Sequence, residues 1–190
     1  MKVLIIPEDP THDQYILKPI VEQIFAELGR KVRVEVLQDP HLGSIDQALD
    51  GKVLREVIDD NPMVDLFLLL VDHDCDRKKN SSRAKAREAE HLGRLIACLA
   101  VEEVEVWMLA LHRDQPGDWK AVRQDCDPRE RYAVPFLERQ GWELEVGRGR
   151  KRAMRELGQG WNGLLQVCPE LQNLRERIRG WLASKRTPPS

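Results

Sequence analysis

The stretch LFLLLV at residues 66–71, followed by DHDCD at residues 72–76, decides the fold of this chain. Six consecutive apolar residues match the length of a strand and are too few to cross a bilayer. A strand that is apolar throughout is typical of a parallel sheet, because helices cover both faces of such a sheet. The stretch therefore predicts a buried parallel strand with acidic residues at its carboxyl end.

Other segments of the chain fit the same architecture. Further strands are predicted at residues 3–6, 32–37 and 104–110, and helical patterns lie between them over residues 11–28, 45–58 and 82–99. Alternating strands and helices predict an α/β fold with a central parallel sheet of about four strands flanked by helices. We expect residues 1–112 to form this core, and residues 113–190 to form a loop-rich and helical extension packed on it. The last helix of the extension is predicted over residues 170–183.

The composition limits the class of protein. Of the 190 residues, 42% are hydrophobic and 33% are charged, which indicates a folded domain with a charged surface. A net charge of −2 excludes a uniform positive coat but leaves room for local basic patches. No signal peptide is predicted, because the first apolar run is too short. The cysteines (Cys75, Cys98, Cys126 and Cys168) form no C-x-x-C pair, which favours a reduced, cytoplasmic setting and argues against zinc.

Acidic residues follow or lie within three of the predicted strands. Glu8 follows the first strand, Asp72 and Asp74 follow the third, and Glu105 lies in the segment 104–110. The carboxyl ends of parallel strands meet at one edge of the sheet, where α/β proteins bind ligands. Gathered carboxylates repel one another unless a cation intervenes, and their oxygens suit Mg²⁺ or Mn²⁺. We expect Glu8, Asp72 and Asp74 to bind metal and Glu105 to complete a catalytic site. The alternative for any one aspartate is a helix cap or a loop residue.

Two basic segments could hold the phosphates of a substrate. Lys79 and Arg83 follow the acidic pair, while Arg150 and Lys151 lie in a second cluster that glycines precede. We expect these four residues to contact phosphate groups, because nucleic-acid backbones are bound mainly by such charges. The alternative is that both clusters are solvated surfaces.

The order of the acids resembles the TOPRIM domain of topoisomerases, primases and related nucleases. With Glu105-x-Trp107 and Leu109 included, residues 1–112 are similar to an uncharacterised family allied to the overcoming-lysogenization-defect (OLD) nucleases. The resemblance implies Mg²⁺- or Mn²⁺-dependent cleavage of DNA or RNA, often beside a partner ATPase and in defence against phage or plasmids. It also implies that Glu8 is a metal ligand or general acid/base, that Asp72 and Asp74 are the metal-binding pair, and that Glu105 is the additional acid of the OLD-like branch.

The chain departs from the family pattern after the first glutamate. Asp9 replaces the usual glycine, and His12 stands where a second acid is expected, with Asp13 one position later. A catalytically silent TOPRIM-like module that binds a partner protein is therefore an alternative, and either form could act as a homodimer. A two-component receiver domain is a third interpretation. The expected Ser or Thr after its fourth strand is missing, because Ala110, Leu111 and His112 stand there.

Overall fold

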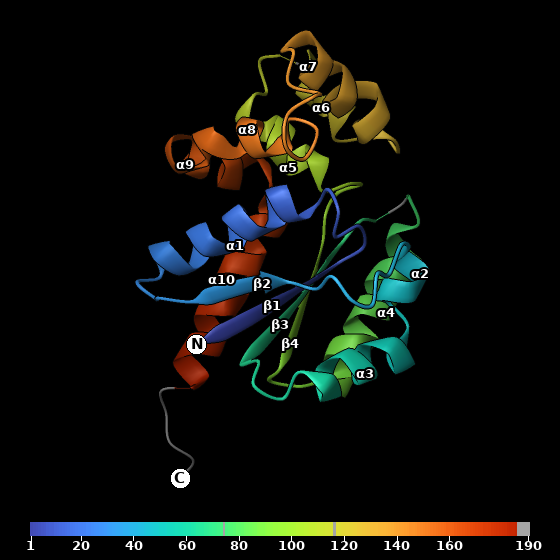
Figure 1. The fold of residues 1–190 in the computed structure, drawn as a ribbon, viewed down its shortest axis with the longest axis vertical. Coiled ribbons are helices and arrows are strands. Elements are labelled where there is room, and N and C mark those ends of the chain that lie inside the picture. The colour runs from blue at the N-terminus through green and yellow to red at the C-terminus, as the bar shows by residue number, and fades with distance from the viewer. Residues whose placement is uncertain (74, 116, 186–190) are drawn as a thin grey trace.

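The central feature of the fold is a four-stranded parallel sheet between two helical layers (Figure 1). The computed structural model describes residues 1–73, 75–115 and 117–185. The strands have the order β2-β1-β3-β4, and every neighbouring pair is parallel. The α/β class and the parallel sheet are thus confirmed. The bounds of the strands are β1 (Lys2–Pro7), β2 (Arg33–Val36), β3 (Leu66–Val71) and β4 (Leu95–Leu99).

The fourth strand is not where the sequence pattern placed it. Residues 104–110 belong almost entirely to a helix, α5 (Glu105–Leu111), while β4 is formed by residues predicted to be helical. Helix α5 is buried at six consecutive positions, from Glu105 to Ala110. A short helix that is buried on all sides has the same unbroken apolar pattern as a buried strand. The pattern therefore could not distinguish the two.

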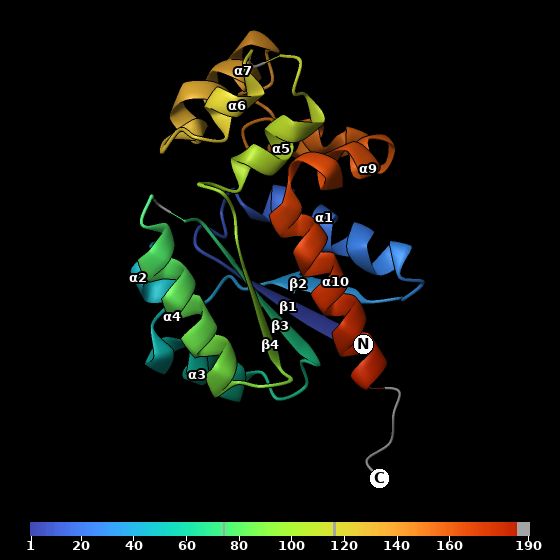
Figure 2. The same cartoon turned by 180° about the vertical axis from the view of Figure 1, so that it is seen from behind.

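Two helices cover one face of the sheet and three cover the other (Figures 1 and 2). Val3 and Ile5 of β1 point into the core beneath the first pair, and Leu4 and Ile6 point into the opposite core. This alternation along one strand follows from the two-residue period of β structure. The first pair is α1 (Gln14–Glu27) and α10 (Pro169–Ser184), and the other three are α2 (Ile45–Ala48), α3 (Gly51–Asp60) and α4 (Arg77–Glu90).

The predicted helix at residues 45–58 is in fact two helices. The carboxylate of Asp50 accepts hydrogen bonds from the backbone N–H groups of Lys52 and Val53, at 2.8 and 3.0 Å. This N-cap starts α3 and separates it from α2. The final helix is confirmed, with Leu171, Leu174, Ile178, Trp181 and Leu182 buried on one side.

Residues 105–115 and 117–167, which we name the helical cap, lie beyond the carboxyl ends of the strands (Figure 1). The chain then returns along the sheet as α10, so the first core contains Ile5 from the start of the chain and Leu174 from its end. The division at residue 112 stays a prediction. After α5 the cap contains α6 (Trp119–Val122), the π-helix η1 (Arg129–Ala133), α7 (Val134–Arg139), α8 (Arg150–Ala153), the 3-10 helix η2 (Met154–Glu156) and α9 (Leu157–Val167).

A disulfide connects the loop after β3 to the helical cap. It joins Cys75 and Cys126, whose Cα atoms are 5.5 Å apart, whereas Cys98 and Cys168 are buried free thiols. The expectation that all four cysteines are reduced is therefore wrong for this structure. The two bonded cysteines are 51 positions apart, and only the tertiary fold brings their loops together. In the described part of the chain, no helix has the length and apolar character that a membrane span requires.

Candidate functional site

Neighbouring parallel strands bring Glu8 and Asp72 to the same edge of the sheet. Strand β1 pairs with β3 in a register that sets Pro7 opposite Leu70, and each acid follows within two residues of that pair. The predicted meeting of acids from the first and third strands follows from this pairing. The second aspartate of the predicted pair, Asp74, lies outside the described residues.

Asp72 is the centre of a group of carboxylates. Its Oδ1 accepts a hydrogen bond from the backbone N–H of Val104 at 2.9 Å, which fixes the side chain against the start of α5. Burial raises the pKa of Asp72 well above its ordinary value, and the negative charges of neighbouring carboxylates raise it further. These neighbours, which with Asp72 we name the acidic cluster, are Asp13, Glu105, Glu8 and Glu103.

Asp13 is a member of the cluster whose role the sequence pattern did not reveal. It is buried at the start of α1, and its Oδ2 accepts a hydrogen bond from the backbone N–H of Asp9 at 3.2 Å. Burial and the charge of Glu105 raise the pKa of Asp13 well above its ordinary value. An acid five positions after Glu8, at the entry to a helix, was the available signal. Its position, one residue later than in the pattern that the chain resembles, obscured this signal.

Glu105 reaches the cluster from a helix and is held there by an arginine. The Nη2 and Nε atoms of Arg150 donate to Oε1 of Glu105 at 2.6 and 3.1 Å, and both side chains are at most 2% exposed. Arg150 was expected to contact a substrate phosphate, and this expectation is corrected. Its guanidinium is enclosed and engaged with Glu105, so it cannot act as a surface contact. Arg129 approaches the same oxygen of Glu105 at 3.9 Å.

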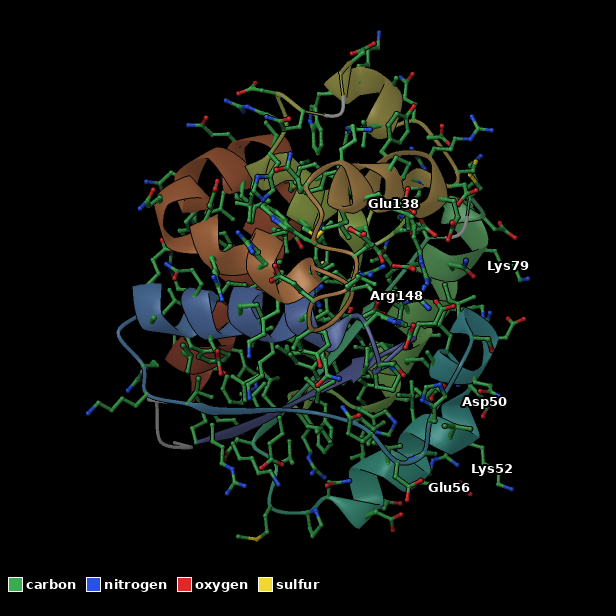
Figure 3. The ribbon with its side chains drawn as sticks, turned by 45° about the horizontal axis from the view of Figure 1, so that its top comes forward. Asp50, Lys52, Glu56, Lys79, Glu138 and Arg148 are labelled. Atoms are coloured by element: carbon green, nitrogen blue, oxygen red, sulfur yellow. A yellow bond between two sulfur atoms is a disulfide. The ribbon has the colours of Figure 1, made fainter. Side chains whose placement is uncertain are left out.

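The other predicted phosphate contacts lie on separate surfaces. Lys79 is exposed on the outer side of α4 and lies 4.0 Å from Asp76 (Figure 3). Arg83 donates to the carboxylate of Asp46 on α2 at 2.5 Å and to its backbone carbonyl at 3.1 Å. Lys151 is exposed on α8, beside a hollow against α1. The four basic residues thus do not form one patch.

Glu102 holds the loop that carries the predicted aspartate pair. Its carboxylate is fully buried, and it accepts hydrogen bonds from the backbone N–H of Cys75 and from the side chain of Arg77. The backbone carbonyl of Glu102 accepts another from His73 N–H at 2.7 Å. A glutamate next to another glutamate reads locally as a surface residue, yet Glu102 is buried and connects the loop after β3 to the loop after β4 on both sides of position 74.

The donor chemistry of the acidic cluster fits a hard divalent cation. Among the described residues, the negative charges of four other carboxyl groups act on Asp72, and the guanidinium groups of Arg129 and Arg150 lie beside one of them, Glu105. Carboxylate oxygens are the ligands that Mg²⁺ and Mn²⁺ prefer. Within the same residues, however, no three His, Cys, Asp or Glu side chains are grouped so that they could hold an ion together. A complete ligand set would therefore need Asp74 or a movement of the carboxylates shown.

Comparison of the chain with protein-family models, with curated proteins and with solved structures gives no match. The residues of the site are thus the basis for assigning a function.

Proposed function

We propose that this chain is a Mg²⁺- or Mn²⁺-dependent nuclease of the TOPRIM type that hydrolyses phosphodiester bonds in nucleic acid. The observation that carries the proposal is the position of Asp72, at the carboxyl end of a central strand and among four other carboxylates. Bringing these charges together is costly for the fold, because each disfavours the ionised form of the others. A bound cation would reduce that cost, and the carboxyl ends of the strands are where α/β sheets bind their ligands.

Glu8, Asp72 and Asp74 are the residues that would hold the ion. A bound divalent ion can generate hydroxide from water near neutral pH and stabilise negative charge on the phosphate oxygens. The chain itself orients the carboxylates. The Val104 N–H holds one oxygen of Asp72, and Arg150 holds Glu105 at the border of the cluster. The helical cap lies over this edge of the sheet, where it can limit access of water.

A cleavage assay tests the proposal. The purified chain, alone and with any co-purifying ATPase, is incubated with single- and double-stranded DNA and RNA in Mg²⁺, Mn²⁺ or EDTA. We expect cleavage only with metal, and a loss of at least about 100-fold for Asp72→Asn, the scale at which a metal ligand contributes. Asp60→Asn, at the exposed end of α3, is the matched control and should cleave like the wild type. Equal cleavage by Asp72→Asn would refute the assignment.

A catalytically silent module that binds a partner protein is the second candidate. It is favoured by the neutralisation of Glu105 by Arg150 and by the lack of a three-ligand group among the described residues. Calorimetric titration with Mn²⁺ separates the two candidates. Binding of Mn²⁺ that depends on Asp72 supports the nuclease, whereas neither binding nor cleavage supports the silent module.

A further inference from the structure

A pocket of about 360 Å³ opens in the helical cap next to the acidic cluster. Arg150, the partner of Glu105, forms one wall, so the pocket and the cluster share this ion pair. Its volume lies within the range of about 300–1,000 Å³ that is typical of small-ligand sites. The side chains that line it combine guanidinium groups, aliphatic surfaces and carboxylates. Those used below are Arg129, Arg148, Leu137, Leu144, Glu138 and Glu143.

Arg148 is held in an unfavourable backbone conformation at this pocket. Its φ is +50°, between Gly147 at +66° and Gly149 at +83°. A Cβ atom at Gly147 would collide with the ring of Tyr15, and one at Gly149 would lie 2.7 Å from the carbonyl oxygen of Trp142. The two glycines therefore let the loop pack closely against Tyr15 and Trp142. The left-handed conformation of Arg148 costs about 1–2 kcal/mol.

The side chain of Arg148 makes no polar contact within the described residues. No ion pair or hydrogen bond to its guanidinium is formed there, and the side chain is exposed. Figure 3 shows Arg148 on a loop of the helical cap close to α1, with Glu138 on another part of the cap. Strain at a non-glycine residue is often retained where the side chain has a function. The free guanidinium is therefore available to a ligand.

Arg129 supplies a second incompletely used guanidinium. Its Nε is buried and has no hydrogen-bond partner among the described residues, and it lies 3.6 Å from Glu130 and 3.9 Å from Glu105. A buried donor without an acceptor costs about 1–3 kcal/mol, so an acceptor brought by a ligand would be favourable. Two such guanidinium groups at one pocket suit a phosphate, because each can donate two parallel hydrogen bonds.

We infer that this pocket binds one nucleotide of the substrate strand, with its phosphate on Arg148 and Arg129 and its base against Leu137 and Leu144. Leu144 is 93% exposed, and a planar base would cover it. The carboxylates of Glu138 and Glu143 can accept hydrogen bonds from amino groups of a base, and they disfavour a bare anion. The inference rests on the proposed function, since the shared ion pair would set this nucleotide beside the bond to be cut.

Binding of nucleoside monophosphates to the full chain in EDTA tests the inference without requiring cleavage. The probes are AMP, GMP, CMP and UMP, compared with the four nucleosides and with inorganic phosphate, all by calorimetry. We expect at least one nucleotide to bind at least tenfold more tightly than both its nucleoside and inorganic phosphate. A nucleoside that binds as tightly as its nucleotide, or inorganic phosphate that does so, would overturn the assignment.

Arg148→Asn is the informative variant, because asparagine accepts a positive φ and lacks the charge. We expect it to weaken nucleotide binding at least tenfold while its thermal unfolding stays close to that of the wild type. Arg139→Ala is the matched control, since Arg139 is an exposed arginine of the same cap that does not line the pocket. Unchanged nucleotide binding by Arg148→Asn would contradict the inference.

Two outcomes separate this inference from the proposed function. A wild type that binds nucleotide but never cleaves nucleic acid would support the pocket and contradict the nuclease. Cleavage by Arg148→Asn with an unchanged KM would support the nuclease and contradict the pocket.

Discussion

The guanidinium of Arg150 on α8 and the carboxylate of Glu105 on α5 form an ion pair that is closed off from solvent, with N···O distances of 2.6 and 3.1 Å. A buried pair of this kind contributes little compared with apolar residues of the same volume. Losing one partner is different, because a charge is then left without compensation in a dry environment. Here that charge would face Asp13 and Asp72, the pKa values of which Glu105 already raises.

Arg150→Ala should therefore destabilise the chain by about 3–5 kcal/mol, the usual cost of breaking a buried pair. The loss is measured as a lower midpoint of urea unfolding at pH 7 with an unchanged slope. Lys151→Ala is the control, because Lys151 is the exposed neighbour on the same helix and should change stability by less than about 0.5 kcal/mol.

The double variant Glu105→Gln with Arg150→Ala identifies the cause of that loss. It removes the unpaired carboxylate but leaves the same lost volume as Arg150→Ala, so we expect it to recover a large part of the stability that Arg150→Ala loses. If the single and double variants unfold at the same urea concentration, lost packing and not the unpaired carboxylate explains the effect.

The local sequence pattern correctly predicted those segments whose pattern is compatible with only one type of secondary structure. The six apolar residues of β3 lie between polar neighbours and form the strand that was expected. The segments 95–99 and 105–111 exchanged their predicted types, because each is short and apolar on all sides. For such segments the deciding contribution is tertiary, since α5 packs inside the cap and β4 pairs with β3.

The candidate site also contains some residues whose positions could be predicted from the sequence and others whose positions could not. Glu8 and Asp72 could be predicted because the parallel sheet alone brings the ends of β1 and β3 together. The partners of the acids could not, because they come from distant parts of the chain. Arg150 is 45 positions from Glu105, and Cys75 is 27 positions from Glu102, to which its backbone N–H donates. No local pattern contains such contacts.

Asp72→Asn should raise the stability of the metal-free chain. The pKa of Asp72 is raised by burial and by neighbouring carboxylates, so the ionised form is unfavourable in the folded state at pH 7. Asparagine removes the charge and can still accept the hydrogen bond from Val104 N–H. We expect a rise in Tm of at least about 2 °C in EDTA, because 1 kcal/mol corresponds to about 2–4 °C in a chain of this size.

Mn²⁺ should reverse the order of stability, so that the wild type has a higher Tm than Asp72→Asn. An ion that binds only the folded state stabilises it by about 2.7 kcal/mol at a hundredfold excess over Kd. We expect Mn²⁺ to raise the Tm of the wild type and of Asp60→Asn, but not that of Asp72→Asn. An equal rise in all three would show that the ion binds elsewhere.

Glu103 should make the stability depend on pH near neutrality. Burial raises its pKa to about 7 from an ordinary value of 4.5, against the hydrogen bond that it accepts from the backbone N–H of Arg129 at 2.6 Å. Between these two values the folded state keeps a proton that the unfolded state has lost. Stability should therefore fall as the pH rises from about 4.5 to about 7, and this contribution should be constant above that range.

Glu103→Gln removes this dependence and so measures it. Because Glu103 is only half-buried, we expect the variant to reduce the change in unfolding free energy between pH 5 and pH 8 by only about 1 kcal/mol. In this variant the unfolding free energy should still fall as the pH rises, because the pKa values of Asp13 and Asp72 are raised as well. Glu56→Gln, at an exposed position of α3, should leave the profile unchanged. A profile that is equally steep in Glu103→Gln would assign the dependence to the two aspartates.

Reduction of the Cys75–Cys126 disulfide should loosen the connection between the loop after β3 and the helical cap. The bond closes a sequence separation of 51 residues, for which the chain-entropy model gives about 4 kcal/mol, and measured values commonly fall below the model. We expect a reductant to lower the free energy of unfolding by about 2–4 kcal/mol. Cys75→Ser with Cys126→Ser should match the reduced wild type and should not respond to reductant. Cys98→Ala should still respond, because Cys98 is a buried free thiol. Identical urea midpoints for the wild type with and without reductant would show that the bond contributes nothing to stability.

The disulfide should also affect metal binding, because Cys75 directly follows the predicted aspartate pair. A titration of the oxidised and the reduced protein with Mn²⁺ measures this effect. Weaker Mn²⁺ binding in the reduced protein would show that the bond also orders the acidic edge of the sheet.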